Sequence, residues 1–191
     1  MILKENITGL ILAGGKSSRM GEDKGFVKLN DTTFMEYIIT AVDPLVSEII
    51  ISSNNPDYDI FGFRRIEDPI KNEGPLVGLF SGFLASQTKY VLVLSCDVPL
   101  INSLVLKSLI TNFEASFDGI MFKQNDQIMP LIGLYKSSCA HKFKTAFDSG
   151  ERRLLNALKT CKMKLLTLGE ASKALTNINT RAELNQIRSW S

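Results

Sequence analysis

The residues best suited to chemistry lie in a glycine-rich segment near the start of the chain, residues 12–24, with the sequence LAGGKSSRMGEDK. Glycines allow a backbone to approach a ligand closely, and Lys16, Arg19 and Lys24 add positive charge. This combination predicts a site for the phosphates of a nucleoside triphosphate. A solvated surface loop is the alternative interpretation, because glycine-rich stretches are also common in such loops.

The glycine-rich segment differs from two common phosphate-binding motifs. It has no Gly-Lys-Ser/Thr at the spacing of a Walker A loop, and it lacks the Gly-x-Gly-x-x-Gly pattern of dinucleotide-binding proteins. A second candidate for chemistry, Asp97, follows the apolar run YVLVLS at residues 90–95. A carboxylate at the end of a buried strand is costly unless a cation, a donor or water accompanies it. Asp97 is therefore a candidate Mg²⁺ ligand, with a turn or helix-capping carboxylate before Pro99 as the alternative.

Strand-like and helix-like segments alternate in the first half of the chain. Short apolar runs predict strands at residues 7–13, 47–53, 63–66 and 90–95, and helical spacing predicts helices at 33–42, 74–87 and 102–113. Such alternation predicts right-handed βαβ units and an α/β fold: a Rossmann-like open, mostly parallel sheet with helices on both faces. Ligands of these sheets bind at the carboxyl ends of strands, where residues 12–24 and Asp97 lie.

The second half of the chain is less regular. It predicts strands at 119–123 and 128–135 around a turn at Asn125 and Asp126, helices at 137–147, 152–159 and 181–190, and an extended segment at 163–168. The chain of 191 residues shows no repeat, linker or low-complexity tract. We therefore expect one domain over residues 1–191.

Composition argues against several classes of function. The net charge is only +2 and the basic residues are scattered, which does not favour nucleic-acid binding. The apolar run at 7–13 is too short to span a bilayer, and Glu5 stands where a signal peptide carries positive charge, so we expect a cytoplasmic protein without membrane association. The cysteines and the single histidine lack metal-ligand spacing, which favours free thiols and a structural histidine; they are Cys96, Cys139, Cys161 and His141.

Residues 12–24 resemble, at every defined position, the opening pattern L-A-G-G-x-S-x-R-M-G-x-D-K of the nucleotidyltransferase family that includes molybdenum cofactor guanylyltransferase. The resemblance continues over nearly the whole chain, in GPLVGL at 74–79, SCDVP at 95–99, GERR at 150–153 and NINT at 177–180. It implies a fold like that of nucleotide-diphospho-sugar transferases. It also implies Mg²⁺-dependent transfer of GMP from GTP to the terminal phosphate of molybdenum-molybdopterin, which releases pyrophosphate and forms the guanine dinucleotide cofactor.

The same resemblance implies roles on the nucleotide side. Arg19 and Lys24 contact the triphosphate, and related enzymes that use pyrimidine nucleotides often have L-A-A-G, so the second glycine favours guanine. Asn54 and Asp68 match positions that contact the nucleoside, although both residue types are also ordinary turn formers. The segment that shapes the base pocket is Leu12, Ala13, Gly14 and Gly15.

For the metal and the acceptor, the resemblance implies Asp97 as a Mg²⁺ ligand, joined by Asn179 or Asn177. Arg152 and Arg153 are expected to contact the acceptor, with a solvated first helical turn as the alternative. The family often has His-Pro where this chain has Met129-Pro130, so pterin contacts from that strand stay open. No general base is required, because the acceptor phosphate is already ionised at neutral pH.

Two other functions compete with this prediction. One keeps the fold and the chemistry but uses CTP or another phosphorylated acceptor. The other is a nucleotide-binding regulator without turnover, which the presence of both Lys24 and Asp97 disfavours. The expected partners are GTP, molybdopterin and a molybdoenzyme chaperone or delivery protein.

Overall fold

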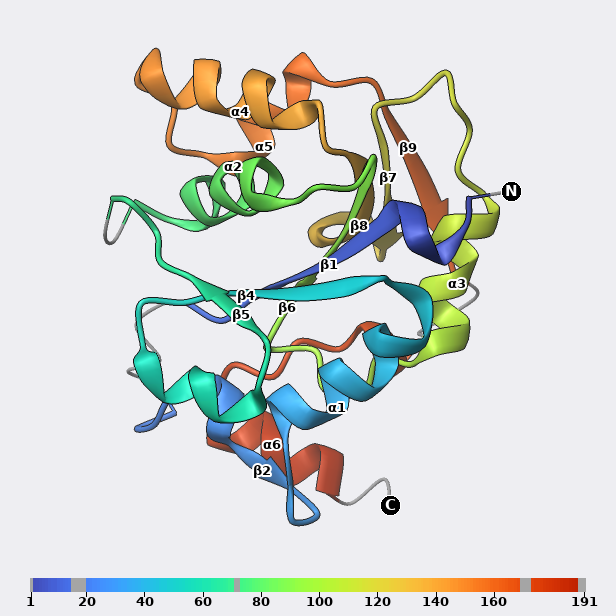
Figure 1. The fold of residues 1–191 in the computed structure, drawn as a ribbon. Helices are drawn as coiled ribbons and strands as arrows, with labels where there is room; N and C mark the ends of the chain where they lie inside the picture. The colour runs from blue at the N-terminus through green and yellow to red at the C-terminus, as the bar shows by residue number, and fades with distance from the viewer. Residues whose placement is uncertain (1, 15–19, 71–72, 169–172, 189–191) are drawn as a thin grey trace.

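A computed structural model describes residues 2–14, 20–70, 73–168 and 173–188. Its centre is a seven-stranded sheet in the order β5-β4-β1-β6-β8-β7-β9 (Figure 1). Among the described strands of this sheet, β8 alone runs against its neighbours, so the predicted mostly parallel sheet is confirmed. The strands are β1 (Ile7–Leu12), β4 (Glu48–Ser52), β5 (Arg64–Ile66), β6 (Tyr90–Ser95), β7 (Gly119–Gln124), β8 (Gln127–Lys136) and β9 (Met163–Thr167).

Helices cover both faces of the sheet (Figure 1). On one face lie α1 (Phe34–Val42) and α3 (Ser103–Thr111); on the other lie α2 (Pro75–Ala85), α4 (Cys139–Asp148) and α5 (Leu154–Ala157). Successive side chains of a strand point to opposite faces, so Ile7 and Ile11 join one core cluster while Leu10 and Leu12 join the other. The continuous apolar run that predicted β1 is therefore explained by burial on both faces.

Two tight hairpins each turn on an Asn-Asp pair with positive φ. Asn125 and Asp126, with φ of 47° and 62°, join β7 to β8 as the sequence predicts. Asn30 and Asp31, with φ of 50° and 66°, join β2 (Lys28–Leu29) to β3 (Thr32–Thr33). Asn and Asp tolerate this region better than most residues, which suits two-residue hairpin loops. The β2–β3 pair was not predicted, because strands of two residues carry no readable alternation.

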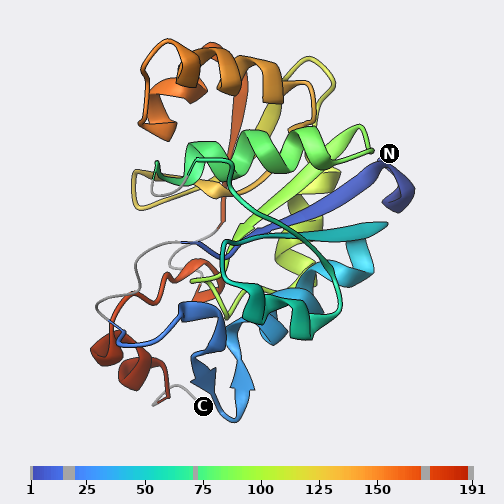
Figure 2. The ribbon, with the colours of Figure 1, turned by 60° about the vertical axis from the view of Figure 1, so that its left-hand side comes forward.

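The last described helix, α6 (Arg181–Arg188), packs beside the β2–β3 hairpin (Figure 2). Its Leu184 and Ile187 share a small core cluster with Met20, Val27 and Ile178. The cluster joins the C-terminal segment to the end of the glycine-rich segment, although the two segments are far apart in sequence. The helix predicted at 181–190 is confirmed as far as Arg188; residues 189 and 190 lie outside the described residues.

The helix predicted at 152–159 begins later and is shorter than expected. It starts at Leu154, and a 3₁₀ turn, Leu158–Thr160, follows it. The Glu151 carboxylate accepts hydrogen bonds from the N–H groups of Arg152 and Arg153, at 2.8 and 2.7 Å, and holds them in a turn before the helix. Both arginines therefore precede α5, and neither lies in its first turn.

Several single residues follow their predicted character. Cys96, Cys139 and Cys161 are free thiols, and His141 lies on the exposed side of α4.

Within the described part of the chain, no helix is both long and apolar enough to cross a membrane.

Candidate active site

The end of β1 is held between the ends of its two neighbours. The Ala13 N–H donates to the Ser52 carbonyl at 2.9 Å, and the Cys96 N–H donates to the Leu12 carbonyl at 3.1 Å. Leu12 and Ala13 are only 8% and 3% exposed, whereas Gly14 is exposed. Of these three predicted base-pocket residues, Gly14 is thus the one that a ligand can reach directly.

Three residues predicted for the triphosphate and the metal meet in the structure, although they come from distant segments. The Lys24 Nζ donates to Asn179 Oδ1 at 2.5 Å and lies 3.5 Å from Asp97 Oδ2. The Lys24 and Asp97 side chains are 20% and 15% exposed. Gly15 and Arg19, the other predictions in this segment, lie outside the described residues.

The second carboxylate oxygen of Asp97 fits a bound cation. Asp97 Oδ1 is buried and has no hydrogen-bond partner among the described residues. Leaving a buried polar atom unpaired costs about 1–3 kcal/mol, and more when it is charged. In the described ranges, no group of three or more His, Cys, Asp or Glu residues is arranged so that it could hold a metal ion. The donors at hand are one carboxylate and nearby amides, which suits Mg²⁺ because this ion needs few protein ligands.

The two asparagines of the NINT motif face different parts of the site. Between them, the buried Ile178 donates its N–H to the Asp97 carbonyl at 2.8 Å. On one side of Ile178, Asn179 contacts Lys24; on the other, Asn177 lines a cavity together with Asp97. Sequence reasoning left open which asparagine faces the metal, and Asn179 is the one that shares a contact with Lys24.

The cavity has a volume of about 280 Å³ and opens beside the end of β6. Its polar lining residues include Asp97 and Asn177. Residues of β8, including Met129 and Pro130, make up much of the rest of its lining. This cavity is adjacent to the Lys24–Asp97–Asn179 cluster through Asp97, so a second substrate bound here would lie next to the first.

The two predicted acceptor-binding arginines are in different situations. Arg152 pairs with Glu73 at 2.7 Å, and its guanidinium carbon lies 4.0 Å from the centre of the Phe147 ring. It also donates to the Phe147 carbonyl at 2.8 Å. Arg153 is exposed. Arg152 thus has clear structural contacts, and a role in acceptor binding remains a prediction for both residues.

The predicted nucleoside residues Asn54 and Asp68 contact each other beyond the ends of β4 and β5. The Asp68 N–H donates to Asn54 Oδ1 at 3.1 Å, and the Ser52 hydroxyl donates to Asp68 Oδ1 at 2.9 Å. Partial burial raises the pKa of the Asp68 carboxyl above its usual range. A Cβ on Gly78 would lie 3.1 Å from both Ser52 Oγ and Leu12 Cδ2, so this glycine lets α2 pack closely here.

Asp23 is a site residue whose structural role sequence reasoning missed. Its carboxylate accepts hydrogen bonds from the Gly25 N–H at 3.2 Å, from Asn55 Nδ2 at 3.1 Å and from the Tyr58 hydroxyl. Tyr58 is 0% exposed, and this burial is the main cause that raises the pKa of its hydroxyl, which stays protonated and donates. Asp23 caps the 3₁₀ turn Lys24–Phe26 and so positions Lys24. An Asp one residue before a turn is a capping signal.

Glu183 and Arg181 of α6 are also missed site residues. Glu183 accepts hydrogen bonds from the N–H groups of Asn179 and Thr180, at 2.6 and 2.9 Å, and the first of these is the largest cause that lowers the pKa of its carboxyl. The sequence signal was Thr-x-x-Glu, the pattern of a helix capping box.

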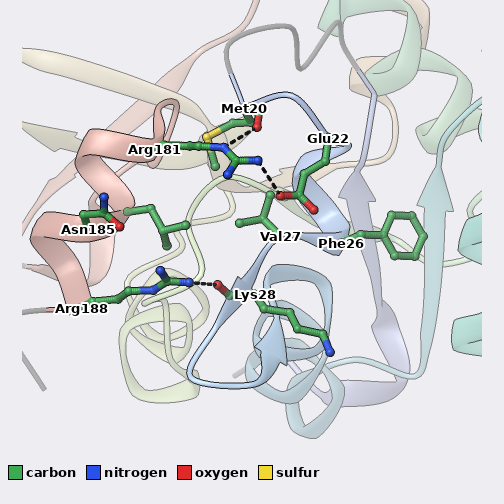
Figure 3. Close-up of a pocket in the computed structure, with 9 residues that line it drawn as sticks. Met20, Glu22, Phe26, Val27, Lys28, Arg181, Asn185 and Arg188 are labelled. Carbon is green, nitrogen blue, oxygen red and sulfur yellow. Dashed lines mark hydrogen bonds and ion pairs between the residues drawn. The ribbon is translucent and has the colours of Figure 1, made fainter.

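Arg181 donates to the Met20 carbonyl at 3.1 Å and lies 3.6 Å from Glu22, beside a pocket of about 340 Å³ (Figure 3).

Residues 9–162 match the family model of the MobA-like NTP transferase domain. The chain belongs to this family. It is 34% identical over 184 residues to a probable molybdenum cofactor guanylyltransferase of Flavobacterium johnsoniae, covering 96% of this chain and 97% of the relative. It is 30% identical over 190 residues to the molybdenum cofactor guanylyltransferase of Vibrio campbellii, covering 97% of each chain. The predicted family is therefore confirmed, and the chain is a nucleotidyltransferase.

A solved structure of a MobA-like protein shares the fold. The molybdopterin-guanine dinucleotide biosynthesis protein A from Archaeoglobus fulgidus superimposes with a TM-score of 0.81 at 20% identity, covering 96% of this chain and 97% of that one. The predicted fold class is confirmed. Nucleotidyltransferases of the MobA-like family generally use a divalent metal, in keeping with the unpaired oxygen of Asp97.

Proposed function

We propose that this protein transfers GMP from GTP to the terminal phosphate of molybdenum-molybdopterin, releasing pyrophosphate and forming molybdopterin guanine dinucleotide. The observation that carries the proposal is the meeting of Lys24, Asp97 and Asn179 beside the ends of β1 and β6. The names of the two relatives supply the identity of the substrates.

The reaction needs positioning and charge more than proton transfer. An oxygen of the acceptor phosphate forms a bond to the α-phosphorus of GTP. The bond from that phosphorus to the oxygen bridging to the β-phosphate breaks, and pyrophosphate leaves with the electron pair. Because the attacking oxygen is already ionised, no residue has to act as a general base. The chain contributes by aligning the two phosphates and by neutralising their charge.

Lys24, aided by Arg19, would offset the charge of the triphosphate. Asp97 and Asn179 would hold Mg²⁺, which when bound supplies positive charge to the α-phosphate and to the departing pyrophosphate. The exposed backbone at Gly14 and the Asn54–Asp68 pair would bind the nucleoside. Gly14, at the position where L-A-A-G has alanine, would favour guanine.

The cavity beside Asp97 would receive the acceptor. It lies between Asn177 and β8, so its occupant would be next to the nucleotide at Asp97. Arg153, which is exposed, would contact the acceptor's phosphate from the adjoining turn. We place this reaction in the cytoplasm, with the product passed on to a molybdoenzyme directly or through a chaperone.

Thermal stability with different nucleotides tests the base preference. GTP with Mg²⁺ at a hundred times its dissociation constant should stabilise the fold by about 2.7 kcal/mol. For a chain of this size, such a gain should raise the unfolding midpoint by roughly 5–10 °C. ATP, CTP and UTP at the same concentration should give smaller shifts. A larger shift with CTP would favour the cytidylyl-transfer alternative, and equal shifts would contradict a guanine preference.

Pyrophosphate release tests the transfer itself. With GTP and Mg²⁺, release should depend on added molybdenum-molybdopterin, and the dinucleotide should be detectable by mass spectrometry. Binding of GTP without any pyrophosphate release in the presence of the acceptor would support the regulator alternative and overturn the proposed enzyme.

A further inference from the structure

We propose that Glu183 is a positioning residue for the metal and triphosphate site. It holds the backbone of Asn179 so that the amide oxygen of this residue faces Lys24 beside Asp97. The proposal rests on the proposed function, because it assigns Asn179 to the Mg²⁺ site. It goes further by naming a residue outside that site on which the geometry of the site depends.

Glu183 reaches one residue beyond the helix that it caps. In the capping box of α6, Thr180 Oγ1 accepts from the Glu183 N–H at 3.2 Å, and Glu183 Oε2 accepts from the Thr180 N–H at 2.9 Å. These two bonds complete the reciprocal cap. The same oxygen also accepts from the Asn179 N–H at 2.6 Å. This additional bond holds the residue whose side chain accepts from Lys24.

The surrounding packing fixes Glu183 itself. Leu184 and Ile187, on the same helix, are 6% and 4% exposed and belong to the core cluster that includes Met20 and Ile178. Arg181 ties the start of α6 to the Met20 carbonyl at 3.1 Å. The helix therefore holds the Glu183 carboxylate in place, and the carboxylate in turn fixes the Asn179 backbone through its hydrogen bond to the Asn179 N–H.

Without the Glu183 carboxylate, the Asn179 segment would keep only part of its anchoring. Ile178 would still donate to the Asp97 carbonyl, at 2.8 Å in the structure. The N–H groups of Asn179 and Thr180 would lose their shared acceptor. Residues that orient metal ligands in this way typically change metal affinity or activity by roughly 10- to 100-fold when they are replaced.

The chain offers a matched control in the capping box of α1. Glu36 Oε2 accepts from the Thr33 N–H at 2.7 Å, and Thr33 Oγ1 accepts from the Glu36 N–H at 3.2 Å. The described hydrogen bonds of the Glu36 side chain are with Thr33 only. Replacing Glu36 removes the same kind of cap without touching Asn179. A general effect of losing a cap is thereby separated from an effect on the site.

The experiment compares wild-type protein with Glu183→Ala, Glu183→Gln and Glu36→Ala by isothermal titration calorimetry. The dissociation constant of GTP is measured with Mg²⁺ and again with EDTA, and their ratio gives the gain in affinity due to the metal. We expect Glu183→Ala to reduce this gain about tenfold, at the lower end of the range for orienting residues, with little change in the EDTA value. Glu183→Gln retains an acceptor oxygen and should lose less. Glu36→Ala should keep the wild-type ratio.

Thermal midpoints complete the test. If Glu183→Ala and Glu36→Ala lose similar stability and both keep the wild-type ratio, Glu183 is only a helix cap and the inference is overturned. If Glu183→Ala does not fold, Glu183→Met, which keeps the length of the side chain but has no acceptor oxygen, decides, and a wild-type ratio in that variant also overturns it. A wild-type protein whose GTP affinity gains nothing from Mg²⁺ would instead contradict the metal site of the proposed function, and the role of Glu183 with it.

Discussion

On the nucleotide side of the candidate active site, side chains from distant segments hold one another, whereas the acceptor side is mainly a wall formed by β8. Lys24 contacts Asp97 and Asn179 directly. Asp23 and Glu183 support this group by accepting hydrogen bonds from the backbone, Asp23 from the Gly25 N–H and Glu183 from the Asn179 N–H. Each of these residues has at least one partner that limits where it can point. The nucleotide side is thus preorganised for charge.

The acceptor side lacks a comparable set of interlocked charges among its described residues. Its cavity is bounded by Asn177 and by apolar side chains such as Met129 and Leu131. Arg152, predicted to contact the acceptor, is occupied by Glu73 and by the Phe147 ring. The difference teaches that residue type alone is a weak guide to function: a charged side chain can be assigned a role only once its partners are known.

The largest effect should come from Asp97→Asn, which tests whether the nucleotide side depends on one carboxylate. The amide has nearly the same shape but no charge to hold a cation. We expect transfer to fall by at least 10²-fold, about the loss caused by removing one electrostatic stabiliser from an active site. The unfolding midpoint should change little, because Asp97 Oδ1 has no partner among the described residues and the contact of Oδ2 with Lys24 is long, at 3.5 Å. Initial rates and thermal melts check both.

Asp118→Asn is the control for Asp97→Asn. Asp118 pairs with Lys142 at 2.7 Å and accepts from the Lys162 N–H at 2.8 Å, away from the site. Its replacement should lower the unfolding midpoint and leave transfer near the wild-type rate. If Asp97→Asn kept more than a tenth of the wild-type rate, the assignment of Asp97 to the metal would be wrong.

Tyr58→Phe should have the next largest effect, because it removes the hydroxyl that donates to Asp23. Loss of a hydrogen bond to a charged group costs about 1.5–3 kcal/mol of stability. We also expect the KM for GTP to rise severalfold, since Asp23 caps the turn that carries Lys24. Steady-state kinetics and chemical denaturation measure the two effects.

Tyr37→Phe is the matched control, since the Tyr37 hydroxyl donates to the Leu29 carbonyl at 3.0 Å. It should lower stability and leave the KM for GTP unchanged. If Tyr58→Phe also alters only stability, Asp23 does not affect GTP binding through Lys24. That result would weaken the contrast between the nucleotide side and the acceptor side of the site.

Replacing the two arginines should separate stability from acceptor binding, with smaller effects. Arg152→Gln should lower the unfolding midpoint, because it removes the Glu73 ion pair and the contact with the Phe147 ring. Arg153→Gln should leave the midpoint unchanged and raise the KM for molybdenum-molybdopterin a few-fold, with the KM for GTP unaffected. The reverse pattern would exchange their roles, and a rise in the KM for GTP would place Arg153 on the nucleotide side.

Asp68→Asn should produce the smallest effect, on stability. Because burial raises the pKa of Asp68, the folded chain holds this proton more tightly than the unfolded chain. The ionised carboxylate therefore costs stability at neutral pH, and this cost fades as the pH falls through the raised pKa and is absent below about 3.9, the ordinary pKa of Asp. Asp68→Asn should raise the denaturation midpoint slightly at pH 7 and lose this advantage in acid. A lower midpoint at pH 7 would contradict the sign.

Much of the fold and several site residues could be predicted because the signals are local. A continuous apolar run identifies β1 and β6 without reference to anything else in the chain. The loop glycines, Lys24 and Asp97 follow strand ends, and parallel strands bring their carboxyl ends to one edge. The β2–β3 hairpin escaped prediction because two-residue strands have no period, and Gly15 and Arg19 stay predictions.

By itself, the sequence determined the α/β fold, the family and the set of residues from which the site is built, because periodicity and motif order survive without coordinates. Only the tertiary structure decided how they pair. Asn177 and Asn179 are the same residue type two positions apart, and the fold places one at the cavity and the other at Lys24. The contacts of Asp23 with Asn55 and Tyr58, and of Arg152 with Glu73, likewise depend on packing between segments that are remote in sequence, which local patterns do not encode.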